Sequence, residues 1–237
     1  TVQPPADWLA KIREREVGIT DRRAKLVALI EHMDPGIGRV MAALEANGQL
    51  ENSLVVFTSD NGGQANVGAC NAPWRGEKQE MWEGGLRVPT CAVWPGRIQA
   101  GSRYDGVTLT MDWLPTLAEV ARAEAPAGIE GHSILGALLG KPAADGERTL
   151  VWVRREGGAK YGGRDYYAIR RGPWKLLQNT PFERPILVNL EEDPREREAL
   201  QAPAKIRREL EAALSEHIRE AGFLPWQGRD PDLEKVE

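Results

Sequence analysis

The chain has 237 residues, 41% hydrophobic and 28% charged, which is enough apolar material for one sizeable core or two small ones. A formal net charge of -4 offers no basic face for a polyanion, so we expect no nucleic-acid partner. No apolar run approaches the ~20 residues of a transmembrane helix, so we expect no membrane span. Cys70 and Cys91 are too few for a disulfide framework, and the sequence leaves open whether they are paired.

The sequence opens on a Pro-rich segment without an initiator Met or a signal peptide, so we expect further sequence upstream. Residues 6–15 then predict a short amphipathic helix, and a longer helical region begins at Asp21 and ends at Asn47 and Gly48. In the longer region, apolar residues recur every three or four positions and predict one buried stripe, interrupted near Pro35. The stripe consists of Leu26, Ile30, Met33, Ile37, Val40, Met41 and Leu44.

Two short apolar runs predict strands of an α/β sheet. Residues 53–59 (SLVVFTS) are rich in β-branched side chains and follow a helix and a turn, as expected of a buried parallel strand. Residues 90–94 predict a second strand of this kind. The Gly-rich stretch between them, residues 62–89, has no period of its own, and long irregular loops inside compact domains are often functional. Residues 111–123 then predict a helix that begins near Asp112.

A linker-like composition at residues 140–148 predicts a boundary, with a first domain over residues 1–140 and a small α+β subdomain over residues 141–237. In the second part, a helix over residues 205–221 should cover one face of a small sheet. A Gly-rich stretch at residues 157–167 predicts a loop that reaches toward a substrate or lies on the surface. The strands of the small sheet are predicted at residues 149–153, 166–170, 174–178 and 186–190, with a hairpin turn at 171–173.

Asp60 and Asn61 follow the first predicted strand, at the edge where open α/β sheets bind ligands. Carboxylate and amide oxygens suit a hard cation such as calcium. Gly62 and Gly63 would let the backbone turn away, so that both side chains could reach one centre. For this tetrapeptide alone, a simple strand-ending turn is the more common interpretation.

Lys78 lies in the Gly-rich stretch, within the sequence Arg-Gly-Glu-Lys. An ammonium group close to a metal would bind a sulfate or phosphate oxygen as a point charge. For an isolated lysine, a solvated surface position is the usual alternative. Further along, we expect Trp82 to pack, the two glycines after Glu83 to permit a tight turn, and Arg87 to pair with Glu83.

Four segments follow one another in an informative order: SLVVFTSDNGG, NAPWRGEKQEMWEGGLRVP, VWPGRI and MDWLPTLAEVA. Their order and spacing closely resemble the type I sulfatase family of the alkaline-phosphatase-like fold. The later segments AIR, WKL and LEEDP resemble the C-terminal strands and acidic turn of that family. The resemblance covers about residues 1–200 and implies an α/β fold. Within that fold, the chain would supply the C-terminal part of the parallel-sheet domain and a small antiparallel sheet packed with a helix.

The resemblance implies that Asp60 and Asn61 ligate one calcium ion and that Lys78 contacts the sulfate. Trp74 stands where the family often has leucine, so its ring either shapes the substrate pocket or packs against the protein. The implied reaction is hydrolysis of a sulfate monoester on a small molecule or a carbohydrate. A phosphonate monoester or phosphodiester hydrolase of the same fold is the enzymatic alternative.

The family attacks sulfate with a formylglycine made within a C/S-x-P-x-R motif, which this sequence lacks. Cys70 does not fit that motif, because one residue too many separates it from Pro73. The paired N-terminal aspartates and the histidines of the family site have no counterpart either. We therefore expect an N-terminal sulfatase polypeptide to supply the nucleophile and the remaining calcium ligands. A non-catalytic fragment or interaction module is the alternative outside enzymology.

Overall fold

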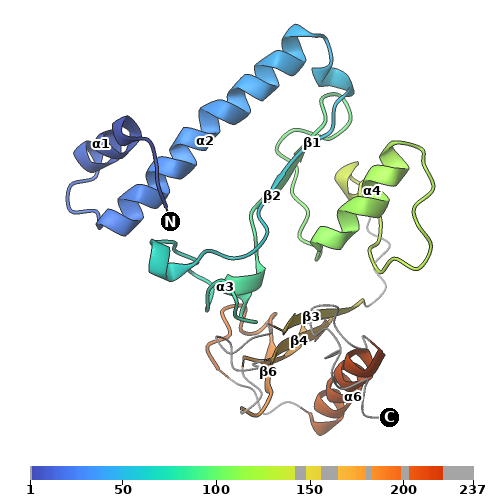
Figure 1. Ribbon diagram of the computed structural model, residues 1–237. Helices are drawn as coiled ribbons and strands as arrows, with labels where there is room; N and C mark the ends of the chain where they lie inside the picture. Colours follow the sequence, from blue (N-terminus) through green and yellow to red (C-terminus); the bar gives the residue numbers. More distant parts are fainter. Residues whose placement is uncertain (1, 142–147, 156–164, 180–182, 199–202, 221–237) are drawn as a thin grey trace, which may run out of the picture. The chain divides into compact units, whose positions relative to one another are not determined.

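The computed structural model describes residues 2–141, 148–155, 165–179, 183–198 and 203–220 (Figure 1). The chain forms two compact units. Unit 1 comprises Thr1–Asp60, Gln64–Ala69 and Val88–Asp145, and unit 2 comprises Asn61–Gly63, Cys70–Arg87 and Gly146–Glu237. Most of the Gly-rich loop therefore belongs to the same unit as the C-terminal sheet. The linker residues 142–147 and most of the predicted loop at 157–167 lie outside the described residues.

The two predicted helices at the start of unit 1 are confirmed as α1 (Ala6–Arg15) and α2 (Asp21–Ala46). They pack through a small apolar cluster of Ile12, Ala24 and Ala28. The interruption of the apolar pattern near Pro35 does not end the helix, because α2 continues through Pro35 for 26 residues in all. Since α1 has only 10 residues, it covers only part of the length of α2.

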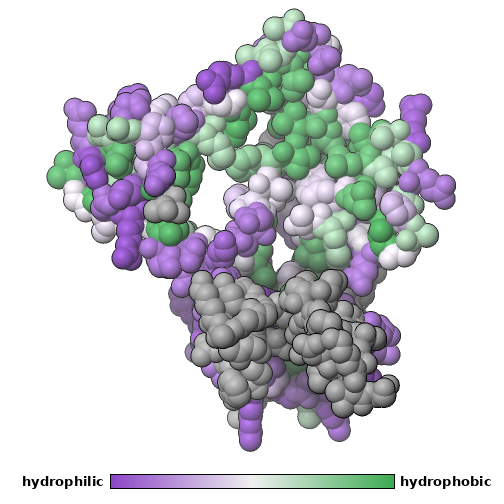
Figure 2. Space-filling model, viewed as in Figure 1, coloured by the Kyte–Doolittle hydropathy of each residue, from purple (hydrophilic) through white to green (hydrophobic). Residues whose placement is uncertain are grey.

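The prediction of a buried stripe along α2 is wrong for four of its members, which are exposed. Their side chains are more than a third exposed, and Val40 reaches 58%. Figure 2 shows apolar surface gathered over the upper part of unit 1, around the end of α2 and the β1–β2 ribbon. The spacing of apolar residues along α2 indicates a helix face that is suited to burial. The described elements of unit 1 do not cover that face. The four residues are Ile30, Met33, Ile37 and Val40.

The two predicted strands of unit 1 exist, but their predicted parallel, buried setting is wrong. Strand β1 (Val55–Thr58) pairs antiparallel with β2 (Thr90–Val93), and Phe57 and Val93 are exposed. An apolar β-branched run favours a strand without specifying the direction of its neighbour. Here the loop that separates the strands returns the chain in the opposite direction, and each strand pairs with the other.

Three short helices follow β2 in the described part of unit 1, and the first of them contains a buried carboxylate. Asp112 accepts backbone N–H bonds from Leu109 at 2.7 Å and from His132 at 2.9 Å. The Thr116 hydroxyl donates to the Asp112 carbonyl at 2.6 Å, which satisfies a second buried polar group. The predicted helix near Asp112 is thereby confirmed, and its polar residues have structural roles. The elements are η3 (Thr110–Asp112), α4 (Trp113–Val120) and α5 (Leu135–Leu138).

Unit 2 is built on a four-stranded antiparallel sheet in the order β3-β4-β5-β6. All four predicted strands are confirmed, as is the turn between the second and third, where Gly172 has a φ of 55°. The predicted last helix is also confirmed. The elements are β3 (Thr149–Arg155), β4 (Asp165–Arg171), β5 (Trp174–Gln178), β6 (Ile186–Asn189) and α6 (Ala204–Glu220), with the short α3 (Glu83–Leu86) in the loop.

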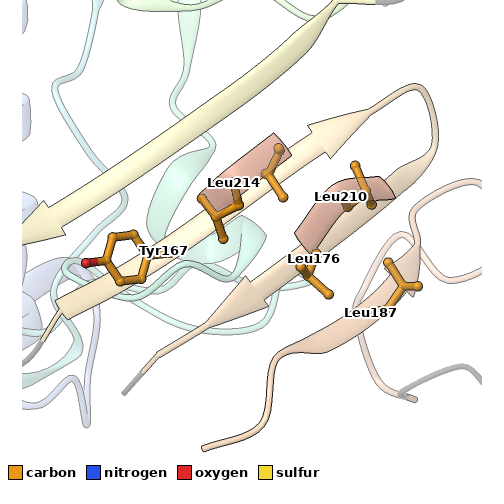
Figure 3. Close-up of a cluster of buried hydrophobic side chains, with 6 residues drawn as sticks. Tyr167, Leu176, Leu187, Leu210 and Leu214 are labelled. Atoms are coloured by element: carbon orange, nitrogen blue, oxygen red, sulfur yellow. The ribbon is translucent and has the colours of Figure 1, made fainter. Parts of the chain in front are cut away.

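Both faces of this sheet are covered. On one face, Leu210 and Leu214 of α6 pack against strand residues that include Leu176 and Leu187 (Figure 3). On the other face, Met81 and Trp82 of the Gly-rich loop pack against Ala168 and Leu177. Neighbouring strand residues point to opposite faces, so the two clusters are separate. The helix was expected from sequence, whereas the loop as a second cover was not.

Among the residues that the structure describes, no helix combines the length and apolarity needed to cross a membrane.

Candidate functional site

Asp60 and Asn61 lie just beyond the end of β1, at the point where the chain passes from unit 1 into unit 2. The Asp60 side chain is exposed, and its carboxylate accepts a long bond of 3.4 Å from the Ser59 hydroxyl. The Asn61 side chain is half-buried and donates from Nδ2 to the Gly62 carbonyl at 2.9 Å. This bond constrains the orientation of the Asn61 amide.

Lys78 lies close to Asn61 along the backbone of unit 2. Its N–H donates to the Gly63 carbonyl at 3.1 Å, two residues from Asn61. The Asn71 side chain reinforces this approach, because it accepts from Gly63 N–H and donates to Gly63 O, both at 2.8 Å. The same amide donates to the Gly76 carbonyl at 3.0 Å. Sequence reasoning assigned no role to Asn71, which here joins the two segments that carry the predicted site residues.

Glycines make this approach possible, whereas the sequence predicted only a tight turn for the pair after Glu83. Gly62 N–H donates to the Gly85 carbonyl at 2.9 Å, and Gly84 N–H donates to the Arg75 carbonyl at 2.7 Å. A Cβ at Gly62 would lie 1.8 Å from the Gly84 carbonyl oxygen, and one at Gly84 would lie 2.4 Å from a backbone oxygen. Any side chain at these positions would push the backbones apart.

A buried ion cluster lies behind this loop and was missed by sequence reasoning. The Lys175 ammonium, fully buried, lies 2.8 Å from a carboxylate oxygen of Glu83 and 2.8 Å from one of Glu196. The second oxygen of Glu196 accepts the backbone N–H of Glu83 at 2.6 Å. Arg87 Nε contacts the second oxygen of Glu83 at 2.5 Å, which confirms the predicted pair. The available sequence signal for Lys175 was a lysine within a largely apolar strand. The sequence around Glu196 gives no comparable signal of a buried carboxylate.

The two carboxylates differ in their electrostatic setting. Burial alone would raise the pKa of Glu83, but Lys175 and Arg87 outweigh it and hold that pKa below its ordinary value. Burial raises the pKa of Glu196, and the attraction of Lys175 does not fully offset it. Glu83 has two cationic partners and Glu196 shares one, so Glu83 is the more firmly ionised of the two.

Trp74 is half-buried, and the guanidinium of Arg87 lies 4.1 Å from its ring centroid. The ring therefore packs on an arginine that is itself held by Glu83, and its role toward a substrate stays a prediction. Trp82 is buried as expected and stacks with Arg75 at 3.6 Å. The question of cysteine pairing is also answered: both cysteines are free and exposed.

The described residues supply only part of a metal site. Among them, no group of three or more His, Cys, Asp or Glu side chains could hold a metal ion. Asp60 and Asn61 offer a carboxylate and an amide oxygen, the donor types that calcium takes, and calcium in proteins has six to eight oxygen ligands. The donor chemistry of this pair is therefore compatible with two positions of a calcium shell, but two ligands do not make up a complete shell.

Two family models match the chain. The Sulfatase model matches residues 5–123, and the model of the N-sulphoglucosamine sulphohydrolase C-terminal region matches residues 74–222. Each covers at least half of the chain, and both agree with the motifs described above. The chain belongs to the type I sulfatase family.

Individual relatives support the same assignment. The rat (Rattus norvegicus) steryl-sulfatase is 39% identical over 121 residues, covering 47% of this chain and 21% of that protein. An N-acetylglucosamine-6-O-sulfatase of Bacteroides thetaiotaomicron is 28% identical over 212 residues, covering 87% of this chain and 36% of that protein. The solved structure of Ps i-CgsB in complex with k-i-k-neocarrahexaose has a TM-score of 0.79 at 26% identity, covering 97% of this chain and 48% of that one.

These matches confirm the expected fold class, the C-terminal part of the alkaline-phosphatase-like sulfatase fold. The chain spans between about a fifth and a half of the length of these relatives.

Proposed function

We propose that the protein to which this chain contributes hydrolyses sulfate monoesters. The observation that carries the proposal is the backbone bond from Lys78 to Gly63, which holds Lys78, the proposed anion-binding residue, beside the segment of Asn61, a proposed metal ligand. A positive charge and oxygen ligands held together suit a reaction in which negative charge develops on sulfate oxygens. Membership of the sulfatase family identifies sulfate as the group transferred to water.

The residues of this chain have distinct roles in the proposal. Asp60 and Asn61 hold one calcium ion, which when bound supplies Lewis-acid polarisation of a sulfate oxygen. The Lys78 ammonium binds a second sulfate oxygen and offsets the charge that develops as the ester bond breaks. The nucleophile is a formylglycine outside these 237 residues, since the sequence holds no C/S-x-P-x-R motif.

We propose a sulfated carbohydrate as the substrate class. The support is that one relative is named for a sulfated sugar and that a similar solved structure holds an oligosaccharide. In this proposal Trp74 forms a wall of the substrate pocket. Its ring is pre-positioned by Arg87, so little side-chain entropy would be lost on binding.

We also propose that an N-terminal sulfatase polypeptide covers unit 1. The apolar stripe of α2 is exposed, and the outer edges of the β1–β2 ribbon pair with no other strand among the described residues. Soluble proteins rarely leave such surfaces uncovered. The relatives are also two to five times longer than the matched segment, as the coverages above imply.

The first test is denaturing mass spectrometry of the protein purified from its source, together with elemental analysis. The expected result is formylglycine on a co-purifying polypeptide, or elsewhere on the same one, with bound calcium. The absence of both would contradict the catalytic proposal.

The second test is hydrolysis of 4-methylumbelliferyl sulfate by the active preparation. Lys78→Ala should lower kcat/KM by roughly 100-fold to 1000-fold, the usual effect of removing a charge-stabilising group. Lys205→Ala is the matched control, because Lys205 lies in the same unit with a side chain 83% exposed. Equal effects of the two variants would remove Lys78 from the site. Faster turnover of a phosphonate monoester would favour the alternative hydrolase.

A further inference from the structure

We propose that Lys175 is a positioning residue for Lys78 and Asn61, acting through the buried cluster that it forms with Glu83 and Glu196. The catalytic role of Lys78 and Asn61 rests on the proposed function. The dependence of their positions on Lys175 does not. Lys175 lies in the middle of β5, where it pairs with Val188 of β6 and with Arg170 of β4. It is a fully buried charged group in a sheet whose buried residues are mostly apolar.

The side chain of Lys175 points toward the Gly-rich loop. Lys175 and Leu177 are two residues apart on β5, so their side chains lie on the same face of the sheet. On this face Leu177 packs against Met81 and Trp82. The ammonium ends between the carboxylates of Glu83 and Glu196, with no exposed surface on the lysine. The lysine thus reaches from the sheet to the first residue of α3.

Glu196 extends the cluster to a second point of the loop. Its carboxylate receives the Glu83 N–H, and its backbone carbonyl receives Arg75 Nη1 at 2.9 Å. Arg75 in turn stacks on Trp82. Arg75, which precedes Lys78 in the loop, and Glu83, which follows it, are therefore both hydrogen-bonded to Glu196.

From α3 the coupling continues through backbone hydrogen bonds. The residue after Glu83, Gly84, donates to the Arg75 carbonyl, and Gly85 accepts from Gly62. α3 therefore contacts the segment before Lys78 and the residue after Asn61. The backbones approach closely at these points, since Cβ atoms added at Gly62, Gly84 or Gly85 would overlap neighbouring backbone. A shift of Glu83 would displace both site segments.

The chemistry of the cluster suits positioning better than stabilisation alone. An apolar contact such as that of Met81 and Trp82 is non-directional and permits sliding. A buried ion pair adds little net stability over apolar residues, but it has one satisfactory geometry, and uniqueness of structure is its best-attested use. In this chain the geometry fixed is that of the loop that bears Lys78.

The test is amide hydrogen exchange, followed by NMR, at Gly62 and Lys78 in the 237-residue chain. Lys175→Met keeps the length of the side chain and removes its charge. It should accelerate exchange at both amides by about tenfold or more, through local opening of the loop. Leu214→Ala is the control, because Leu214 lies in the other apolar cluster of unit 2. It should leave those two amides within about threefold of wild type at a temperature where both variants are folded.

Unchanged protection in Lys175→Met, or equal acceleration in Leu214→Ala, would overturn the proposal. If Lys175→Met does not fold, Glu196→Gln serves instead, since it keeps the shape and removes one charge. Glu196→Gln should accelerate exchange at the same amides by a smaller factor. Unchanged exchange in this variant would contradict the coupling.

An activity measurement separates this inference from the proposed function. In the active preparation, Lys175→Met should lower kcat for 4-methylumbelliferyl sulfate by roughly tenfold to a hundredfold, as expected when a reacting group is misplaced. Leu214→Ala should not lower it. An inactive wild-type enzyme would refute the proposed function and leave the exchange result intact. An active wild type with unchanged exchange and kcat in Lys175→Met would refute the positioning role alone.

Discussion

Unit 1 and unit 2 bury their apolar residues to very different degrees. Unit 2 covers both faces of its sheet, with α6 on one side and the Gly-rich loop on the other, and adds a buried ion cluster. The cluster between α1 and α2 is small by comparison, and Ile30, Val40 and Leu114 are all more than half exposed. The same kind of apolar periodicity thus leads to burial in one unit and exposure in the other.

The difference shows what a hydrophobic pattern encodes. In unit 2 the covering elements belong to the same chain, so the pattern and the structure agree. In unit 1 the pattern marks surfaces that the described elements of this chain do not cover. Three predictions follow from the comparison, beginning with the largest expected change in the free energy of unfolding.

Lys175→Met should destabilise unit 2 by about 3–5 kcal/mol at neutral pH, because two buried carboxylates lose their shared cation. In the wild type, the lowered pKa of Glu83 gives stability that is present above its ordinary pKa of 4.5 and is lost as the pH falls through the folded value. In the variant, the folded pKa values of the carboxylates rise, so its stability should fall as the pH increases. The gap between the two proteins should widen from about pH 4 to about pH 8 in urea unfolding.

The double variant Lys175→Met with Glu196→Gln is the matched control. It removes one of the two buried carboxylate charges that lose their cation in Lys175→Met. It should therefore recover part of the lost unfolding free energy at the higher pH. A gap that does not change with pH would mean that Lys175 contributes packing rather than charge.

Leu210→Ala and Val40→Ala test the difference in burial directly, because both truncate an apolar residue on a helix. Leu210 is 1% exposed in the α6 cluster, and its truncation should cost about 2–5 kcal/mol. Val40, 58% exposed on α2, should change the unfolding free energy of the isolated chain by no more than about 0.5 kcal/mol. Urea midpoints, followed separately for each unit, would measure both.

If Val40→Ala lowered the unfolding free energy as much as Leu210→Ala does, the stripe of α2 would be buried in solution. In the preparation completed by the rest of a sulfatase, the same Val40 variant should weaken assembly. Comparing the two preparations would show whether the stripe is an interface.

Sequence predicted the parts of the fold whose partners are near in the chain. The strands β3–β6 pair each with the next strand in the chain, and the regular apolar spacing of α6 marks the face that packs on them. The direction of β1 relative to β2 was not predictable, since side-chain pattern does not encode it. The loop as a cover of the C-terminal sheet was also missed, because Met81 and Trp82 carry no information on a partner some 90 residues away.

Sequence motifs suggested residues for the candidate site, but they did not suggest the residues that support it. Family motifs marked Asp60, Asn61 and Lys78, and the structure brings the last two segments together through Gly63. The Lys175–Glu83 contact joins residues 92 apart in sequence. Nothing local to either residue could have specified that distance, although a lone lysine in the apolar strand WKLL indicated a buried partner.

The smallest predicted change concerns Gly38, in the exposed part of α2. A Cβ at this position would meet nothing within 4 Å, and its backbone is helical. Gly38→Ala should therefore stabilise α2 by about 0.5–1 kcal/mol, since alanine loses less backbone entropy in a helix. Gly48→Ala, at a φ of 65° just after α2, should destabilise it instead. If Gly38→Ala reduces stability in the completed enzyme while stabilising the chain alone, the glycine is needed for close approach of a covering element.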